Sequence, residues 1–382
     1  MNTVPNITVI GAGFGAVTAV KTLRKTNPVA RITLISPEPT MQYYPSLIWV
    51  PAKIRSRDDI MVDLKPLLAR LDVNYQPGRV VGVEAEGRRV LVEHGGETIG
   101  VDNDGLIVAS GGRFIKKLPG IEHAITVCEG IDAAERIRDR LASMTGGTIA
   151  IGFGGNPNEP SAVRGGPMFE MLFGIDRLLR KQGRRDQFKI VFFNPSNRPG
   201  NRLGESAVDN LLARMKKFDI EARLGAKMQR FEADKVVTEA GEFAADLILF
   251  MPGMTGPAWM EHAPFPKSPG GMIQAEATTK VVGSEKVYVV GDSGSYPSPD
   301  WAPKQAHMAD LMAVAAAHNL LAELAGQPAN ETFKWELICV MDMLDRAVLV
   351  FRNEKRQFIT PPCRLLHYAK RLFEWWYLRS IR

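Results

Sequence analysis

Cysteine is scarce in this sequence, which has only Cys128, Cys339 and Cys363 among its 382 residues. Three cysteines are too few for a disulfide scaffold, so each is a packing, thiol or redox group. Runs of 18 or more apolar residues are also absent, so we expect no transmembrane helix. The six histidines are scattered and no Cys-x-x-Cys occurs, which predicts no metal site. No nucleic-acid-binding motif is visible either.

Net charge and chain length further limit the class of protein that this sequence can encode. The formal net charge is +6, and the last 20 residues carry much of the excess. The chain length predicts two or three domains with sizeable cores. The first strand is expected within a few residues of the start, which leaves no room for a signal peptide.

The most informative pattern is Ile-Thr-Val-Ile-Gly-Ala-Gly-Phe-Gly-Ala, at residues 7–16. It predicts a strand at 7–10, a glycine turn and a helix at 14–26, followed by a strand at 31–35. Gly11 suits the tight turn, Gly13 permits close approach of a pyrophosphate, and Gly15 lets the helix pack against the strand. This context favours a dinucleotide site over an ordinary turn, and we expect the dinucleotide to be FAD.

A second strand–helix–strand unit is expected from residues 148–155, with its next strand at 188–193. Two features disfavour a nicotinamide cofactor there. Pro157 and Pro160 interrupt a tight phosphate-binding helix start. The second strand ends in Asn194-Pro195, with neither an acid for the NAD ribose nor an obvious arginine for NADP. We interpret the unit as a degenerate Rossmann unit.

Further segments complete a family pattern. The sequence resembles the sulfide:quinone oxidoreductases and the related flavoprotein subunit of flavocytochrome c sulfide dehydrogenase, over nearly its whole length. The resemblance rests on the GxGxxA start, 43–50 (Tyr-Tyr-Pro-Ser-Leu-Ile-Trp-Val), 57–60, Gly291-Asp292, Pro303-Lys304, 335–346 (Trp-Glu-Leu-Ile-Cys-Val-Met-Asp-Met-Leu-Asp-Arg) and the terminal helix from 366.

The resemblance implies an α/β fold with two tandem Rossmann-like dinucleotide-binding domains and a C-terminal amphipathic helical region. We expect the first part of the FAD domain at 1–112, the degenerate domain at 113–245, the second part of the FAD domain at 246–330, and a quinone- and membrane-associating region at 331–382.

The implied activity is that of an FAD-dependent oxidoreductase, which passes two electrons from a sulfide-like donor to membrane quinone. Asp292 is implied to accept a hydrogen bond from the ribityl chain, and Lys304 to stabilise charge near flavin N1 and O2. Ser36 stands where the ribose-binding acid is expected, and Glu38 follows two residues on. The expected FAD contacts are Gly11, Ala12, Gly13, Phe14, Gly15, Ala16, Ser36, Pro45, Ser46, Val81, Ala109, Gly111, Gly291, Asp292 and Lys304.

The implied catalytic thiols are Cys339, at a family cysteine position, and Cys128, at one that looks less central. The family's middle cysteine is missing, because its pattern aligns with residues 161–170, where Val163 or Arg164 stands. Cys128 substitutes for it only if it lies close enough. We expect Cys363 to pack.

The terminal segment from 364 to 382 has apolar residues at helical spacing, five cations and the aromatic run at 375–377. With the resemblance, this favours an interfacial helix on an anionic membrane over a core-packing helix. We expect a peripheral membrane protein, on the cytoplasmic face by default. The implied quinone contacts are Phe373, Lys370 and Val340. Whether Tyr43, Tyr44 and Trp49 line the pocket or the core stays open, as do homo-oligomerisation and covalent attachment of FAD.

Two alternative functions remain. A type II NADH:quinone reductase-like enzyme is disfavoured by the poor second nucleotide motif. A flavin-bearing electron-transfer subunit without sulfide turnover is kept open by the missing cysteine.

Overall fold

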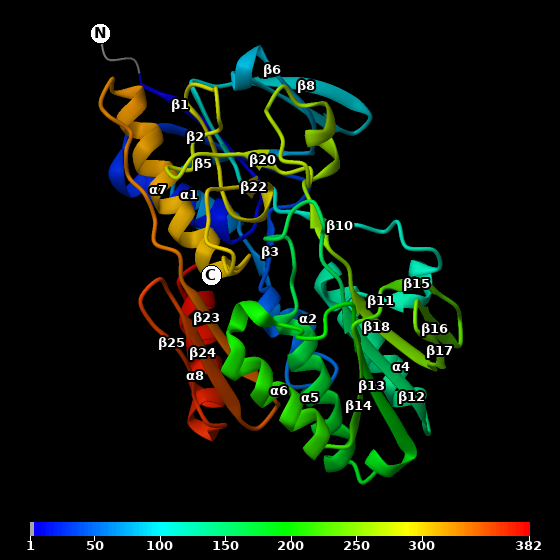
Figure 1. The fold of residues 1–382 in the computed structure, drawn as a ribbon. Coiled ribbons are helices and arrows are strands. Elements are labelled where there is room, and N and C mark those ends of the chain that lie inside the picture. Colours follow the sequence, from blue (N-terminus) through cyan, green and yellow to red (C-terminus); the bar gives the residue numbers. More distant parts are fainter. Residues whose placement is uncertain (1–3) are drawn as a thin grey trace.

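The computed structural model describes residues 4–382, and two parallel five-stranded sheets organise the fold (Figure 1). The first sheet has the order β21-β9-β1-β2-β5. Val9, in its central strand, pairs with Leu34 on one side and Ile107 on the other. Its strands are β1 (Asn6–Ile10), β2 (Arg31–Ser36), β5 (Val73–Pro77), β9 (Gly105–Val108) and β21 (Val287–Val289).

Two helices, α1 (Phe14–Thr26) and α7 (Ala306–Leu324), pack against each other beside the first sheet. Both helices bury small apolar residues, which permit close approach: Ala16, Ala19 and Val20 in α1, and Ala313, Ala316 and Ala317 in α7. A three-stranded meander covers the other side of the sheet, with β6 (Arg79–Glu84), β7 (Arg89–His94) and β8 (Glu97–Asp102).

The second sheet has the order β11-β18-β12-β13-β14 and is also parallel. Its strands are β11 (Ala124–Ile125), β12 (Gly147–Phe153), β13 (Phe188–Asn194), β14 (Ile220–Leu224) and β18 (Leu247–Met251). The helices beside it are α4 (Ile131–Ser143), α5 (Gly166–Lys181) and α6 (Glu205–Lys217). The three inner strands β12, β13 and β18 are buried over most of their length, as expected for a parallel sheet covered on both faces, whereas the edge strands β11 and β14 are less buried.

Short elements complete the two regions. They are β3 (Thr40–Gln42), the 3₁₀ helix Tyr44–Trp49, α2 (Arg57–Ile60), β4 (Met61–Asp63), α3 (Lys65–Arg70), β10 (Arg113–Phe114), β15 (Met228–Phe231), β16 (Lys235–Thr238), β17 (Gly241–Ala244), β19 (Met254–Thr255), β20 (Ile273–Gln274) and β22 (Gly294–Ser295).

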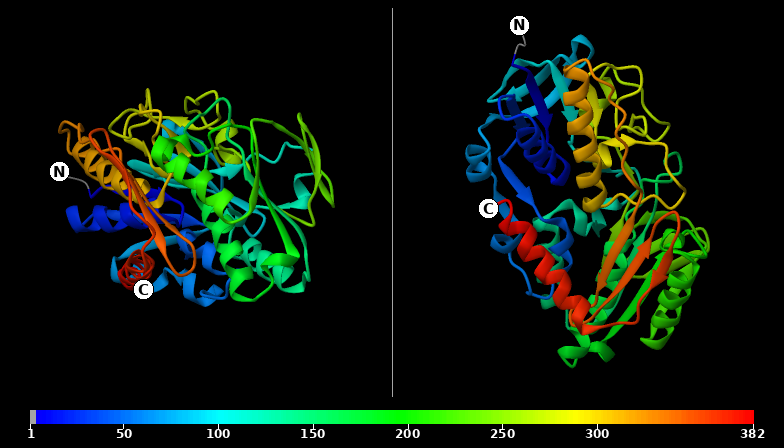
Figure 2. Two further views of the ribbon diagram at one scale, coloured as in Figure 1. Left: turned by 60° about the horizontal axis from the view of Figure 1, so that its bottom comes forward. Right: turned by 90° about the vertical axis from the view of Figure 1, so that its left-hand side faces the viewer.

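The C-terminal region contains an antiparallel sheet that sequence analysis did not anticipate. It consists of β23 (Leu337–Asp342), β24 (Ala347–Arg352) and β25 (Gln357–Ile359), and it precedes the expected helix, α8 (Arg364–Arg379). Figure 2 shows α8 along the outer surface of the molecule, beside this sheet. The predicted α/β fold with two Rossmann-like units is confirmed.

Candidate active site

A cavity of about 1980 Å³ lies where the two parallel sheets and the C-terminal elements meet. Both catalytic cysteines predicted from the sequence and all three predicted quinone contacts line it. So do twelve of the expected FAD contacts: Gly11, Ala12, Gly13, Phe14, Gly15, Ser36, Pro45, Ala109, Gly111, Gly291, Asp292 and Lys304. The fold therefore brings residues from distant parts of the chain to one space.

Three of the expected FAD contacts do not line the cavity. Val81 points to the opposite face of β6 and is exposed, while its neighbour Val80 lines the cavity. A strand alternates its side chains, so an error of one residue reverses the face. Ser46 is buried within the 3₁₀ helix, and Ala16 is buried in the first turn of α1.

The glycine turn after β1 forms a cradle for a phosphate group. Gly11 has φ +117°, and a Cβ there would lie 2.3 Å from the Ala109 carbonyl oxygen. A Cβ on Gly15 would lie 2.8 Å from Val290 Cγ2. A Cβ on Gly13 would instead meet no atom within 4 Å, so its open side faces the cavity. With α1 beginning at Phe14, this arrangement fits the pyrophosphate of a dinucleotide.

The adenosine end predicted from the sequence lies at the end of β2. Ser36 Oγ donates to the Glu38 carbonyl oxygen at 2.6 Å, and Tyr75 Oη donates to the Ser36 carbonyl at 2.9 Å. The Ser36 hydroxyl is thus used within the chain. Glu38 and Arg79 line the cavity beside it.

Arg164, one of the two residues predicted to stand where the family has its middle cysteine, lines the cavity. It forms an ion pair with Asp292 and contacts Cys128. Burial raises the pKa of the Cys128 thiol to about 11, although the Arg164 guanidinium opposes this shift. The Cys128 thiol is therefore neutral at pH 7.

Lys304 lies just before α7 and lines the same cavity. Its Nζ donates to the Gly294 carbonyl oxygen at 2.8 Å. Burial lowers the pKa of Lys304, and the Asp292 carboxylate opposes that shift. Lys304 thus lies inside the cavity near the Asp292 carboxylate.

Cys339 lies on β23, next to the N-terminus of α5. A Cβ built on Gly166 would come within 3.8 Å of its Sγ. Burial raises the pKa of the Cys339 thiol to about 12; Glu170 raises it further and Lys370 opposes it. All three cysteines are free. Cys363, expected to pack, is instead exposed, and its Sγ accepts from the Leu365 N–H at the start of α8.

Lys370 connects α8 to the cavity. Its Nζ donates to Glu170 Oε1 at 2.5 Å and to the Val340 carbonyl oxygen at 3.0 Å. Glu170 Oε1 also accepts from the Asp342 N–H at 2.9 Å. Burial raises the pKa of Glu170, and the Lys370 ammonium opposes the shift. Glu170 and Lys370 therefore lie side by side at the wall of the cavity that also carries Cys339.

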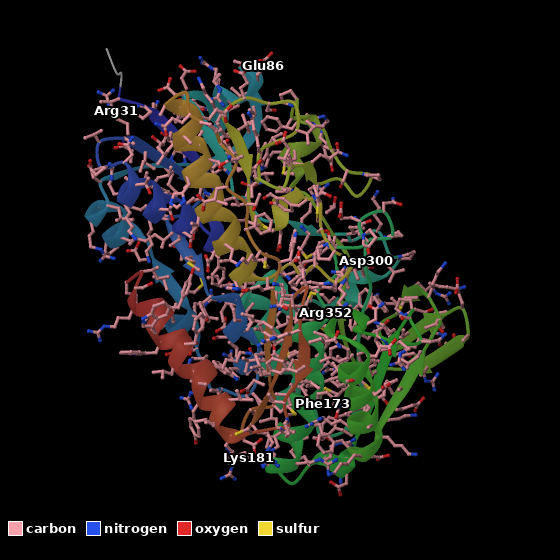
Figure 3. The ribbon with its side chains drawn as sticks, turned by 60° about the vertical axis from the view of Figure 1, so that its left-hand side comes forward. Arg31, Glu86, Phe173, Lys181, Asp300 and Arg352 are labelled. Carbon is pink, nitrogen blue, oxygen red and sulfur yellow. The ribbon has the colours of Figure 1, made fainter. Side chains whose placement is uncertain are left out.

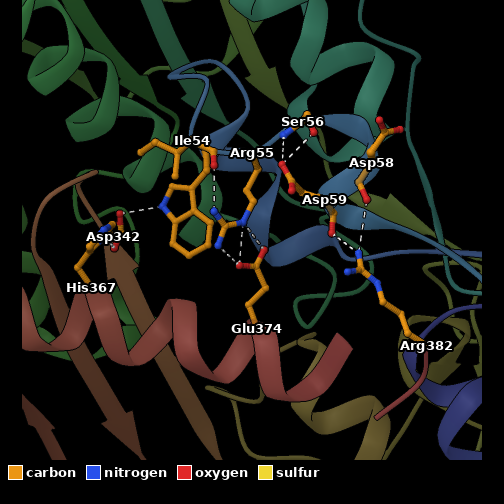
Figure 4. A network of polar contacts seen from close by, with 10 residues as sticks. Ile54, Arg55, Ser56, Asp58, Asp59, Asp342, His367, Glu374 and Arg382 are labelled. Atoms are coloured by element: carbon orange, nitrogen blue, oxygen red, sulfur yellow. Dashed lines mark hydrogen bonds and ion pairs between the residues drawn. The ribbon is translucent and has the colours of Figure 1, made fainter. Parts of the chain in front are cut away.

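A further buried network lies under α8 and was not found from the sequence (Figure 4). Trp49 Nε1 donates to Asp342 Oδ1 at 2.9 Å, and His367 Nδ1 lies 2.7 Å from Asp342 Oδ2. Arg55 Nε donates to both carboxylate oxygens of Glu374, at 2.9 and 3.0 Å. Trp49 is thus a core residue, whereas Tyr43 and Tyr44 line the cavity.

Helix α8 exposes several large apolar side chains and buries two polar ones beside Leu378. Its buried residues include His367 and Glu374, whereas Leu372 and Trp376 are 64% and 58% exposed. The other exposed apolar residues of α8 are Leu365, Tyr368, Phe373 and Trp375. An outward apolar face of this size is unusual for a soluble surface and marks an interaction site. No helix within residues 4–382 is long and apolar enough to cross a membrane.

Asp310 couples α1, α7 and α8. Its Oδ1 accepts from Thr18 Oγ1 at 2.6 Å and from Tyr377 Oη at 3.5 Å. Burial raises the pKa of Asp310 to about 6; the hydrogen bonds from Thr18 and Tyr377 and the charges of His307 and Lys21 oppose this.

We expect Asp310→Asn to make the protein more stable at high pH but not at low pH. The folded pKa exceeds that of the unfolded chain, so the proton held by folded Asp310 contributes stability below about pH 4 and this is lost as pH rises through about 6. At pH 8 the variant should gain on the order of 2 kcal/mol in free energy of unfolding. Denaturant unfolding between pH 4 and 8 measures this, and a pH-independent difference contradicts it.

The two sheets, the glycine cradle and the shared cavity define a two-dinucleotide-binding flavoprotein, an FAD-dependent oxidoreductase. Residues 5–313 match the family described as pyridine nucleotide-disulphide oxidoreductase. The chain belongs to this family.

Individual relatives agree with this assignment. The chain is 24% identical over 410 aligned residues to the sulfide-quinone reductase of Aquifex aeolicus, with 99% of this chain and 91% of that protein covered. The crystal structure of the sulfide:quinone oxidoreductase from the same organism superposes with a TM-score of 0.88 at 22% identity, and the same shares of each chain are covered. NDH2 from Plasmodium falciparum, solved with NADH, gives a TM-score of 0.76 at 12% identity, with 97% and 94% covered. The predicted resemblance and the predicted FAD cofactor are confirmed.

Proposed function

We propose that the protein passes two electrons from a sulfide-like donor through FAD to a membrane quinone. The observation that carries this proposal is one cavity that joins the glycine cradle, the Cys339 thiol and the α8 residues Lys370 and Phe373. FAD, when bound, accepts two electrons from a donor and releases them to an acceptor.

On the donor side we assign Cys339 as the residue that takes up sulfur. The balanced step is RSH + HS⁻ → RSSH + H⁺ + 2e⁻, in which RSH is the Cys339 thiol. Its raised pKa means that the thiol must lose its proton during the step, and Glu170 is the nearby carboxylate that raises that pKa. Cys128 lies against Arg164 instead, and we assign it no sulfur-carrying step.

On the acceptor side we assign Lys370, Phe373 and Val340 to the quinone headgroup. Reduction of the quinone to the quinol requires two electrons and two protons. Glu170 holds a proton more readily than an ordinary carboxyl because it is buried, and it hydrogen-bonds to Lys370 Nζ. We propose that this pair delivers protons to the quinone oxygen.

We further propose that the apolar face of α8 binds the membrane, which brings the quinone to Lys370. The exposed Leu365, Leu372 and Trp376 lie on the same helix as the cations Arg364 and Arg379. Apolar insertion combined with attraction to anionic headgroups suits a helix that lies in the interface.

The double variant Leu372→Ser and Trp376→Ser should bind vesicles of phosphatidylcholine and phosphatidylglycerol at least about 10-fold more weakly, because two large apolar groups no longer leave water. Vesicle co-sedimentation measures the change. Val29→Ser is the matched control, because Val29 is also exposed and apolar but lies outside α8. Equal binding of the double variant and the wild type contradicts membrane attachment through α8.

NADH as donor is the second candidate, and one observation favours it. The cavity extends over the carboxyl end of the second sheet, where Gly154, Asn194 and Arg198 line it. The connection between β12 and α5 argues against NADH binding there, however. Helix α1 begins four residues after β1 ends, whereas β12 ends at Phe153 and α5 begins only at Gly166. The intervening loop separates the helix N-terminus from the strand, so no tight phosphate turn forms.

The proposed function is tested by steady-state reduction of decylubiquinone in vesicles, with sulfide or NADH as the donor. We expect quinone reduction with sulfide and none above background with NADH. Quinone reduction with NADH alone favours the second candidate. Inactivity with both donors in FAD-loaded protein contradicts the proposal and favours a flavin-bearing electron-transfer subunit.

A further inference from the structure

Two arginines from separate elements face one end of the cavity. Arg202 lies between β13 and α6, and Arg352 ends β24; both line the cavity. Arg352 Nη1 donates to the Arg202 carbonyl oxygen at 3.0 Å, and its guanidinium lies 5.2 Å from the centre of the Trp301 ring. Figure 3 labels Arg352 and Asp300 where the C-terminal strands meet the rest of the molecule.

Neither arginine has a carboxylate partner. Within residues 4–382, no Asp or Glu oxygen lies within 4 Å of either guanidinium. Arg202 Nη1 donates only to the carbonyl oxygens of Ser161 and Ala302, each at 3.1 Å. Burial lowers the pKa of Arg202 to about 10, and it lowers the pKa of Arg352 as well. Both side chains nevertheless stay charged at neutral pH.

The surrounding carboxylates compensate this cationic end only in part. Glu159 and Asp300 act on Arg202 only at longer range. Asp292 is already paired with Arg164. Lys304 is a further cation nearby, and the charges of Arg164 and Arg202 help to lower its pKa. A partly buried guanidinium without a close counter-ion is costly, so the binding of an anion beside the two arginines would be favourable.

We propose that Arg202 and Arg352 form a subsite for an anionic group on the electron donor. This inference rests on the proposed function and refines its substrate class: the donor is a small sulfur compound that also carries a carboxylate or sulfonate. The planar guanidinium suits such groups because it presents paired N–H donors to two oxygens. The indole of Trp301 lies beside the Arg352 guanidinium, and its apolar surface suits the carbon skeleton of a sulfur compound larger than sulfide itself.

The FAD phosphates do not explain the subsite. The glycine cradle that suits them lies after β1 and at the start of α1, whereas Arg202 and Arg352 belong to the second sheet region and the C-terminal sheet. If the two arginines did hold FAD, their variants would lose the cofactor. The flavin content of each variant therefore decides this point directly.

The test uses the FAD-loaded protein and two redox-inert probes that differ only in charge, (methylthio)acetate and its neutral amide, (methylthio)acetamide. Binding is followed by the perturbation of the flavin absorption spectrum. We expect the carboxylate to bind at least about 10-fold more tightly than the amide, and Arg202→Gln and Arg352→Gln each to remove about that factor. Arg202→Lys should keep part of the preference because it keeps the charge.

Arg223→Gln is the matched control, because Arg223 is paired with Glu221 and does not line the cavity. Equal affinity for the two probes, an unchanged preference in both glutamine variants, or loss of FAD from them overturns the subsite. Sulfide-dependent quinone reduction is measured on the same preparations. If that activity is absent while the charge preference follows the arginines, the subsite stands and the proposed sulfide chemistry is wrong.

Discussion

Replacing Cys339 with serine should slow reduction of the flavin by sulfide by about 100-fold or more, while FAD content stays at the wild-type level. The thiol is the sulfur acceptor in the proposed step, and a serine hydroxyl cannot form the S–S bond. The Cys339 side chain lies near Gly166 and is affected by the charges of Glu170 and Lys370. Serine is close to cysteine in size, so the substitution replaces the sulfur atom without opening a cavity. Anaerobic single-turnover reduction measures the effect.

Two further cysteine variants sharpen that result. Cys363→Ser is the matched control, because Cys363 is exposed at the start of α8 and serine preserves its capping role. Cys128→Ser tests whether the buried thiol beside Arg164 shares the chemistry. We expect both to reduce flavin at nearly the wild-type rate. Wild-type behaviour of Cys339→Ser contradicts the assigned role, and loss of activity in Cys128→Ser assigns Cys128 a step as well.

Replacing Lys370 with methionine should slow reoxidation of the flavin by quinone by about 100-fold, a much larger effect than on reduction by sulfide. The variant removes the cation that hydrogen-bonds to Glu170 and Val340, so the proposed proton delivery stops. A smaller slowing of the sulfide step is also expected, since Lys370 normally lowers the pKa of Cys339. Stopped-flow mixing of reduced protein with decylubiquinone separates the two half-reactions.

Folding must be separated from chemistry in this variant. Loss of one partner of a buried ion pair leaves Glu170 without its cation, which costs about 3 kcal/mol or more. The double variant Lys370→Met and Glu170→Gln removes both charges and should recover stability without recovering the quinone rate. Lys355→Met, in the exposed turn after β24, is the matched control. Recovery of the quinone rate in the double variant shows that Lys370 acts through stability alone.

The glycine turn of the dinucleotide cradle could be predicted from the sequence because its glycines lie within one short segment. Gly11, Gly13 and Gly15 lie at every second position of one short segment, so the pattern is visible in the sequence, although the close contacts of Gly11 and Gly15 are with distant parts of the chain. Cys339 and Lys370 came from motifs that the resemblance supplied. Val81 is the FAD contact predicted from the sequence, but its neighbour Val80 lines the cavity. Side chains alternate along a strand, and the sequence does not show which of the two faces meets the cavity.

The contacts that sequence analysis missed join residues far apart in the chain. Trp49, Asp342 and His367 form one buried network whose ends lie more than 300 positions apart, and their motifs gave no sign of the pairing. Arg202 and Arg352 likewise meet only after the second sheet and the C-terminal strands have packed. The terminal helix is predicted as amphipathic, but only the structure shows that it buries His367 and Glu374 while large apolar side chains such as Trp376 are exposed.

Anaerobic stopped-flow absorption of the bound flavin tests the central claim most directly, with sulfide and NADH as separate donors and decylubiquinone added afterwards. The account predicts rapid bleaching by sulfide, none by NADH, loss of bleaching in Cys339→Ser, and return of the oxidised spectrum with quinone. Bleaching by NADH with no response to sulfide would contradict it, and would transfer the donor site from Cys339 to the carboxyl end of the second sheet.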